Sequence, residues 1–205
     1  MREQNLLAQL NVSRETMERL EIFEQVLLKW NPKINLVSRA SLNNLWTRHI
    51  IDSIQVYRSV EAPDHWLDIG SGGGFPGLIV GIMAAEEAPN VVVTLIESDQ
   101  RKSVFLRTAA RECGIKINVL SERIEQVERL AANVLSARAL ADLNTLLGFA
   151  DHHLDPDGIA LFPKGVTWRK ELEEARQNWR FEVDPIKSLT EPDAVILKVR
   201  GVARA

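Results

Sequence analysis

The segment WLDIGSGGGFPG, residues 66–77, decides the fold of this chain. Its apolar start ends in an acid, Asp68, and a glycine-rich turn follows. Glycine adopts positive φ and lets a ligand approach the backbone closely, because it has no Cβ. Pro76 suits the first turn of a helix, where its missing N–H is not needed. The segment therefore predicts a strand, a tight turn and a helix, the nucleotide-binding corner of an open α/β sheet.

Two kinds of nucleotide ligand fit this corner by pattern. Residues 72–77 match G-x-G-x-x-G, the dinucleotide fingerprint. Asp68 with Gly70, Gly72 and Gly74 matches the acid-plus-glycines loop of S-adenosylmethionine (AdoMet) methyltransferases. A dinucleotide would place its pyrophosphate on this turn, where the carboxylate of Asp68 repels it. AdoMet carries a sulfonium and an ammonium, which a carboxylate attracts, so Asp68 favours AdoMet.

A second acid supports a nucleoside site. Residues 91–96, VVVTLI, predict a buried parallel strand that ends at Glu97. A carboxylate at this position accepts hydrogen bonds from both ribose hydroxyls of a nucleoside. Both candidate ligands contain a ribose, so Glu97 strengthens the prediction of a nucleotide site without choosing between them.

Length and composition limit the class of protein. The 205 residues, 45% of them apolar, suit one large domain or a domain with a small extension. No apolar run is long enough to span a bilayer, and the first residues lack the form of a signal peptide. Cys113 is the only cysteine, so we expect a reducing, cytoplasmic location. The net charge of −3 argues against broad polyanion binding but allows a local basic face.

The first sixty residues predict helices. Apolar residues between Met17 and Trp30 recur at helical spacing, Ser13 suits an N-cap, and Pro32 predicts an end near Asn31. We expect Trp30 to belong to the core. Residues 1–62 are therefore predicted to form a helical extension on an α/β core, residues 63–205.

From residue 65 onward, strands and helices alternate. Further strands are predicted at 116–120, 133–137 and 159–162, with a turn at 155–158 and a final antiparallel pair near 181–186 and 194–199. Helices are predicted after Ser98, after Asp142 and over residues 168–178, and Gly114 suits a helix end. Polar residues follow the strands at the edge where open parallel sheets bind ligands. They are Asp68, Glu97, Arg123, Arg138 and Lys164.

Several motifs together resemble one family. They are WNxxxNL at 30–36, RHxxDS at 48–53, DIGSGGGFPG at 68–77, Glu97 with RK at 101–102 and FL at 105–106, SARA at 136–139, and KG at 164–165. From about residue 20 to the last strand, the chain resembles the RsmG (GidB) family of bacterial 16S rRNA guanine-N7 methyltransferases. The GFPG extension of the loop and the RHxxDS run are specific to this family, whereas the glycine loop alone is not.

The resemblance implies a class I methyltransferase fold, with a seven-stranded, mostly parallel sheet, an antiparallel last strand and a helical N-terminal extension. It implies AdoMet as the methyl donor and a guanine in the decoding region of 16S rRNA, free or in the small subunit, as the acceptor. By motif, Gly73 and Leu78 contact the cofactor at the loop, Ile124 and Glu125 flank its adenine, and Arg138 reaches the pocket. A departure is Ser121-Glu122-Arg123, where the family often has a glycine before the arginine.

The implied chemistry needs few catalytic groups. Guanine N7 has an in-plane lone pair and no proton at neutral pH, so it attacks a sulfonium methyl without a general base. Arg123 and Arg138 are candidates to hold O6 beside N7, since arginine is the usual partner of that edge. His49 and Asp52 lie three apart on one predicted helix face; we favour a hydrogen bond that docks the extension, with the acceptor pocket as the alternative role. No metal-ligand spacing is present.

RNA contacts are predicted at Arg101, Lys102 and Lys164, with the first two equally compatible with solvated helix charges. We expect a monomer. A nicotinamide-dependent oxidoreductase and a non-catalytic ribosome-assembly factor are the rival functions; Asp68 opposes the first, and the intact loop with Glu97 opposes the second. The residues alone leave a methyltransferase for protein or metabolites open, and the family motifs exclude it.

Overall fold

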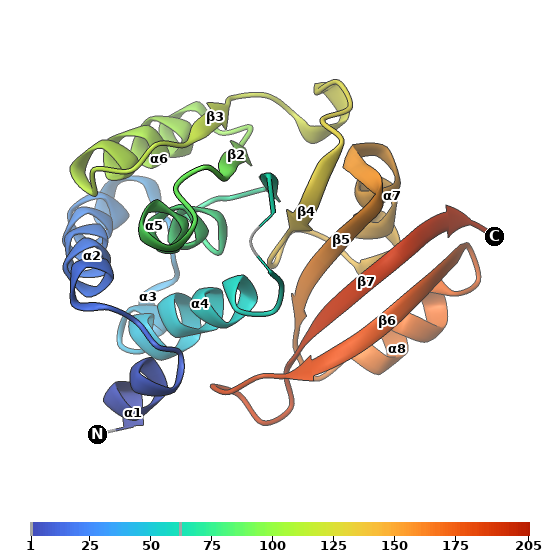
Figure 1. Cartoon of the computed structure of the whole chain (residues 1–205), viewed down its shortest axis with the longest axis horizontal. Coiled ribbons are helices and arrows are strands. Elements are labelled where there is room, and N and C mark those ends of the chain that lie inside the picture. Colours follow the sequence, from blue (N-terminus) through green and yellow to red (C-terminus); the bar gives the residue numbers. More distant parts are fainter. Residues whose placement is uncertain (1, 62) are drawn as a thin grey trace.

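Seven strands form one mixed sheet in the computed structural model, which describes residues 2–61 and 63–205 (Figure 1). The spatial order is β3-β2-β1-β4-β5-β7-β6, and β7 runs antiparallel to both of its neighbours. This topology confirms the predicted fold class. The strands are β1 (His65–Ile69), β2 (Val92–Ile96), β3 (Asn118–Leu120), β4 (Ala132–Ser136), β5 (Leu154–Lys164), β6 (Trp179–Lys187) and β7 (Val195–Arg204).

Helices cover both faces of the sheet, in two separate apolar cores. The first core contains the N-terminal helices α1 (Arg2–Gln9), α2 (Arg14–Ile34), α3 (Arg39–Leu42), the π-helical turn η1 (Trp46–Ile51) and α4 (Asp52–Tyr57), together with α5 (Gly77–Glu87) and α6 (Gln100–Glu112). The second contains the 3₁₀ turn η2 (Ile124–Gln126), α7 (Leu143–His153) and α8 (Trp168–Ala175).

Strand β1 shows why the sequences of the central strands are continuous apolar runs. Side chains alternate between the two faces of a strand. Trp66 packs in the first core, whereas Leu67 and Ile69 pack in the second, and all three are fully buried. A parallel strand covered on both faces has no solvent side, so the sequence carries no polar alternation there.

The N-terminal helices pack directly against the glycine-rich loop. The buried ring of Phe23 on α2 lies 5.4 Å from that of Phe75 in the loop, measured between centroids. Trp30 on the same helix is half-buried at the edge of the first core, and its ring lies 6.0 Å from that of Phe105 of α6. The predicted boundary residue, Ala62, lies outside the described residues. The division of the chain into a helical extension and a core stays a proposal. The packing of α2 against the glycine-rich loop supports it.

Two elements differ from the sequence-based expectation. Helix α2 continues through Pro32 to Ile34, because the proline removes only one N–H and the next turn closes through Asn35 N–H donating to the Asn31 carbonyl. Strand β5 begins at Leu154 and runs through the expected turn, with a register shift opposite β4. Gly158 makes this possible, since a Cβ there would lie 3.0 Å from the Ala132 carbonyl oxygen.

The helix caps follow the expected chemistry. Ser13 and Asp142 accept hydrogen bonds from the first-turn N–H groups of α2 and α7, as predicted. Helix α6 differs, because Asp99 rather than Ser98 accepts from its first N–H groups. Gly114 follows α6 with φ of +65°, the left-handed conformation expected of a residue that ends a helix.

Candidate functional site

Two cavities open at the carboxyl edge of the sheet and share one residue, Ala139. The first, called here the loop cavity, measures about 450 Å³. The second, called here the arginine cavity, measures about 490 Å³. Ala139 follows β4 and has φ of +53°, so the chain turns sharply at the point where the two cavities meet.

The loop cavity lies between the ends of β1, β2 and β4. Besides Ala139, its lining includes Gly70, Gly72, Glu97, Lys102, Arg123, Ile124, Glu125 and Leu140. The lining thus brings together five predicted cofactor residues, one predicted RNA contact, Lys102, and one predicted acceptor-positioning residue, Arg123. The lining carries the carboxylates of Glu97, Glu122 and Glu125 against the cations of Lys102 and Arg123. An excess of acid in a nucleotide-sized cavity disfavours a pyrophosphate.

Glu97 ties the glycine loop to the next strand. Its Oε2 accepts a hydrogen bond from Gly72 N–H at 2.8 Å, and its Oε1 accepts from Asp99 N–H at 2.8 Å. Gly72 has φ of +53°, which a glycine adopts without strain. Each carboxylate oxygen accepts more than one hydrogen bond, so Glu97 keeps acceptor capacity for a ligand in the cavity.

Asp68 lies beneath the loop rather than on the wall of either cavity, and its contact with the cofactor stays a prediction. The side chain is fully buried. Its Oδ1 accepts from Ser136 Oγ at 2.6 Å, and Ser136 Oγ accepts from Trp66 Nε1 at 2.9 Å. Burial raises the pKa of Asp68 to about 6. The acid therefore joins β1 to β4 under the loop.

Three other loop residues expected at the cofactor also face inward. Gly73 is buried, and a Cβ there would lie 3.1 Å from the Leu36 carbonyl oxygen. A Cβ on Gly74 would meet Leu78 at 3.0 Å, and Leu78 itself is fully buried. Gly73, Gly74 and Leu78 therefore line neither cavity, and the close packing of the N-terminal helices on the loop is the reason.

The arginine cavity is centred on Arg138. Its Nη1 donates to the Arg48 carbonyl oxygen at 2.9 Å, its Nη2 donates to His49 Nδ1, and its Nη1 lies 4.0 Å from Asp52 Oδ2. The guanidinium carbon also lies 5.2 Å from the ring centroid of Phe75. This one side chain thus connects β4, the π-helical turn η1 and the glycine loop.

His49 is held as a neutral ring. It stacks on Phe75 with centroids 4.9 Å apart and an interplanar angle of 31°. Burial, followed by the charges of Arg138 and Arg48, lowers its pKa to about 3. Because Nδ1 accepts from Arg138, the ring proton belongs on Nε2, which is buried and has no hydrogen-bond partner among the described residues. His49 and Asp52 both contact Arg138, and the hydrogen bond between Arg138 and His49 joins the N-terminal helices to the end of β4.

The opposite wall of the arginine cavity is the connection between β6 and β7, which α4 holds in place. Asp52 Oδ1 accepts from Thr190 Oγ1 at 2.8 Å and from Ser188 Oγ at 3.4 Å. Gln55 donates to the Lys187 carbonyl oxygen at 2.7 Å and accepts from Leu189 N–H at 2.9 Å. These contacts could not be predicted from the sequence, because the partners lie more than 130 residues apart and no local pattern marks them.

Lys164 lies on the wall of the arginine cavity, where its ammonium is already engaged by other groups of the chain. Its ammonium donates to the Ala141 carbonyl oxygen at 2.9 Å and pairs with Glu171 at 2.7 Å, and only 10% of the side chain is exposed. It fastens α8 to the end of β5, and its contact with RNA stays a prediction. Arg101 is exposed, and its guanidinium lies 3.5 Å from the carboxylate of Asp99. Lys102 and Arg123 line the loop cavity, whereas Arg138 lines the arginine cavity.

Among the described residues, no group of three or more His, Cys, Asp and Glu side chains is arranged to hold a metal ion. Within the same residues, no helix is both long and apolar enough to cross a bilayer.

The strand order, the glycine loop and the acid after β2 define the class I AdoMet-dependent methyltransferase fold. The O-methyltransferase from Bacillus cereus, solved in complex with SAH, superposes with a TM-score of 0.62 over 97% of this chain and 96% of that chain, at 13% sequence identity. At this identity the likeness shows the fold alone.

Sequence relationships identify the family. The family model described as GidB, rRNA small subunit methyltransferase G, matches residues 16–196. The ribosomal RNA small subunit methyltransferase G of Ruegeria pomeroyi is 63% identical over 195 residues, covering 95% of this chain and 96% of the relative. That of Cereibacter sphaeroides (strain ATCC 17023) is 50% identical over 204 residues, covering 99% of both chains. The chain belongs to the rRNA small subunit methyltransferase G family of AdoMet-dependent enzymes.

Proposed function

We propose that this enzyme transfers a methyl group from AdoMet to N7 of one guanine in 16S rRNA, with the cofactor in the loop cavity and the guanine in the arginine cavity. The observation that carries the proposal is the meeting of the two cavities at Ala139. Methyl transfer needs the acceptor atom, the methyl carbon and the sulfur in line, with reacting atoms about 3–3.5 Å apart beforehand. Two cavities that share Ala139 as a wall residue support this proposal.

The loop cavity suits AdoMet by charge and by hydrogen bonding. When bound, AdoMet supplies a methyl group already activated by its sulfonium. The carboxylates of Glu97, Glu122 and Glu125 favour its cationic groups, and Glu97 has acceptor capacity for ribose hydroxyls. Ile124 and Glu125 bound the same cavity and are proposed to flank the adenine. A nicotinamide dinucleotide is disfavoured by the same acids.

The arginine cavity suits a base that needs orientation and no deprotonation. Two N–H groups of Arg138 are engaged by Arg48 and His49, and the remaining ones can donate to guanine O6, which lies beside N7. The N7 lone pair forms the new bond to the methyl carbon while the electron pair of the breaking bond stays on sulfur. His49 does not act as a base here, since its Nδ1 already accepts a hydrogen bond.

A product and rate experiment tests the proposal. Purified enzyme, labelled AdoMet and small ribosomal subunits lacking the modification should yield label in 16S rRNA that maps to a guanine cleaved by N7-specific chemistry. Single-turnover rates between about pH 6 and 8.5 should be nearly flat, because no group must lose a proton first. Label at a position other than N7 would refute the acceptor, and a unit slope of log rate against pH would refute the base-free mechanism.

A further inference from the structure

A groove lies between α2 and α6 and shares no lining residue with the loop cavity or the arginine cavity. It measures about 360 Å³ and is lined by Val26, Lys29, Trp30, Lys33, Thr108, Arg111 and Glu112. Three of these side chains are cations and one is an anion, on a chain whose net charge is −3. Figure 1 shows α2 and α6 packed side by side at the far end of the molecule from β6 and β7.

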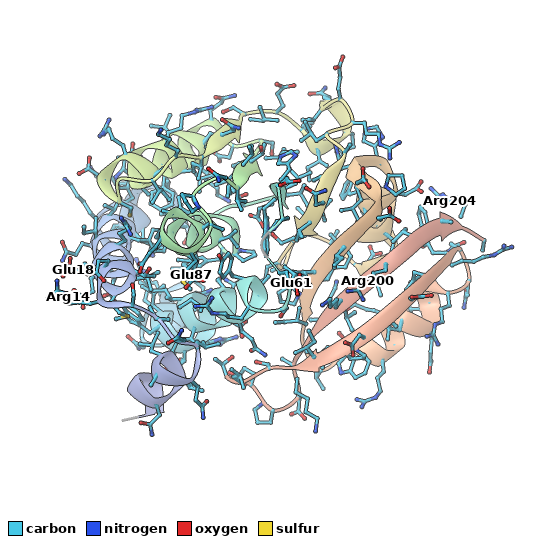
Figure 2. All side chains as sticks on the ribbon, in the orientation of Figure 1. Arg14, Glu18, Glu61, Glu87, Arg200 and Arg204 are labelled. Carbon is cyan, nitrogen blue, oxygen red and sulfur yellow. The ribbon has the colours of Figure 1, made fainter. Side chains whose placement is uncertain are left out.

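Charge is distributed unevenly along α2. Its N-terminal half carries acids beside its arginines, and Arg14 lies 3.6 Å from Glu18. Figure 2 shows both side chains on the outer face of the helix. Its C-terminal half carries Lys29 and Lys33 and no acid after Glu24. Within residues 2–61 and 63–205, neither lysine forms an ion pair.

Lys29 and Lys33 are exposed, four residues apart on one helix face. Like charges at this spacing repel each other and destabilise a helix, and their Cβ atoms lie about 5–6 Å apart. A bound anion would relieve the repulsion. A strand of RNA presents successive phosphates at a comparable separation, and the partly apolar floor of Val26 and Trp30 accommodates a ribose or an unstacked base.

We propose that this groove binds the phosphate backbone of the substrate rRNA, remote from the nucleotide that is methylated. Arg111 lies nine residues after Lys102 on α6, about 14 Å along the helix axis at the usual rise of 1.5 Å per residue. A folded rRNA is large enough to reach both places at once. The groove then supplies part of the affinity that an acidic protein otherwise lacks. The proposal rests on the rRNA substrate of the family and is independent of which cavity holds AdoMet.

A site-directed crosslink tests the identity of the partner. Cys113 is the only cysteine, and burial raises the pKa of its thiol to about 12, so a new exposed cysteine can be labelled selectively. Thr108→Cys places a photo-crosslinker in the groove, and Lys170→Cys on the exposed face of α8 is the control. With small ribosomal subunits, the Thr108→Cys enzyme should crosslink to 16S rRNA more than the control does. Crosslinking to ribosomal protein alone, or to neither, would overturn the proposal.

Salt dependence tests the charge. Lys29→Gln/Lys33→Gln should make the slope of log affinity against log salt less steep by about two, one for each phosphate that the variant no longer neutralises. Arg14→Gln/Lys170→Gln removes the same formal charge at paired, exposed positions and should change the slope little. AdoMet affinity and the rate at saturating subunit should stay at the wild-type level in both, which separates this result from failure of the catalytic site. Equal slopes in the two double variants would refute a phosphate contact at the groove.

Discussion

Arg138, which follows β4, donates a hydrogen bond from Nη2 to Nδ1 of His49, 89 residues earlier in the chain. The bond joins the N-terminal helices to the edge of the sheet where the two cavities meet. It also fixes the tautomer of His49 and, with burial, keeps the ring neutral. The predicted histidine thus acts on the site through the arginine that it orients.

Arg138→Lys should lower the methyl-transfer rate by about 10²–10³, because an ammonium cannot reach Arg48, His49 and the guanine together. AdoMet affinity should change less than threefold. Single-turnover assays and calorimetric titration measure the two effects. Arg123→Lys is the matched control in the other cavity and should retain most of the rate; equal losses in both variants would contradict the central role of Arg138.

His49→Asn should change how stability depends on pH. The folded-state pKa of His49 is about 3 and its ordinary value is 6.5, so below pH 6.5 the unfolded chain binds a proton that the folded chain does not. The wild type should therefore lose stability relative to His49→Asn as the pH falls from 7 to 5. Asp68, with its raised pKa, acts in the opposite direction, so only the difference between the two proteins is diagnostic. A difference in unfolding free energy that is constant with pH would contradict the assignment.

Local signals in the sequence identified the strands, the caps at Ser13 and Asp142, and the edge that bears the cavities. Each depends on residues that are close in the chain. The true setting of Asp68 could not be predicted, because its partner Ser136 lies 68 residues away. Lys164 was placed at the correct strand end, but its pairing with Glu171 depends on how α8 folds back. The sequence predicted which residues end each strand, but it did not predict which distant side chains they contact.

Glu97→Gln should weaken AdoMet binding by about tenfold or more. Both oxygens of Glu97 accept from backbone N–H groups, and the amide nitrogen of glutamine would face one of those donors. Calorimetric titration measures the loss. Glu122→Gln, an exposed acid of the same cavity, removes the same charge without these hydrogen bonds and should cost much less. Similar losses of AdoMet affinity in the two variants would show that Glu97 contributes only its negative charge.

His153 and its neighbour His152 make similar contacts with backbone carbonyl oxygens, but only the contact of His153 borders the loop cavity. His153 Nε2 lies 3.3 Å from the carbonyl oxygen of Ile124, which borders the loop cavity, whereas His152 Nε2 lies 3.3 Å from that of Val127, which does not. His153→Leu should raise KM for AdoMet about three- to tenfold with a smaller change in kcat. His152→Leu should leave KM near the wild-type value, and His153→Gln should restore part of the loss. Steady-state kinetics with saturating subunit decide this, and equal KM values for both leucine variants would contradict it.

The central claim is that guanine N7 accepts the methyl group directly in the arginine cavity. The most direct measurement is methyl incorporation into 16S rRNA, assembled into small subunits, that carries 7-deazaguanosine at the mapped nucleotide. This analogue replaces N7 by carbon and keeps O6 and the Watson–Crick edge. We predict no incorporation above background, with binding to the enzyme largely retained. Incorporation at the rate of unmodified subunits would show that another atom accepts the methyl group.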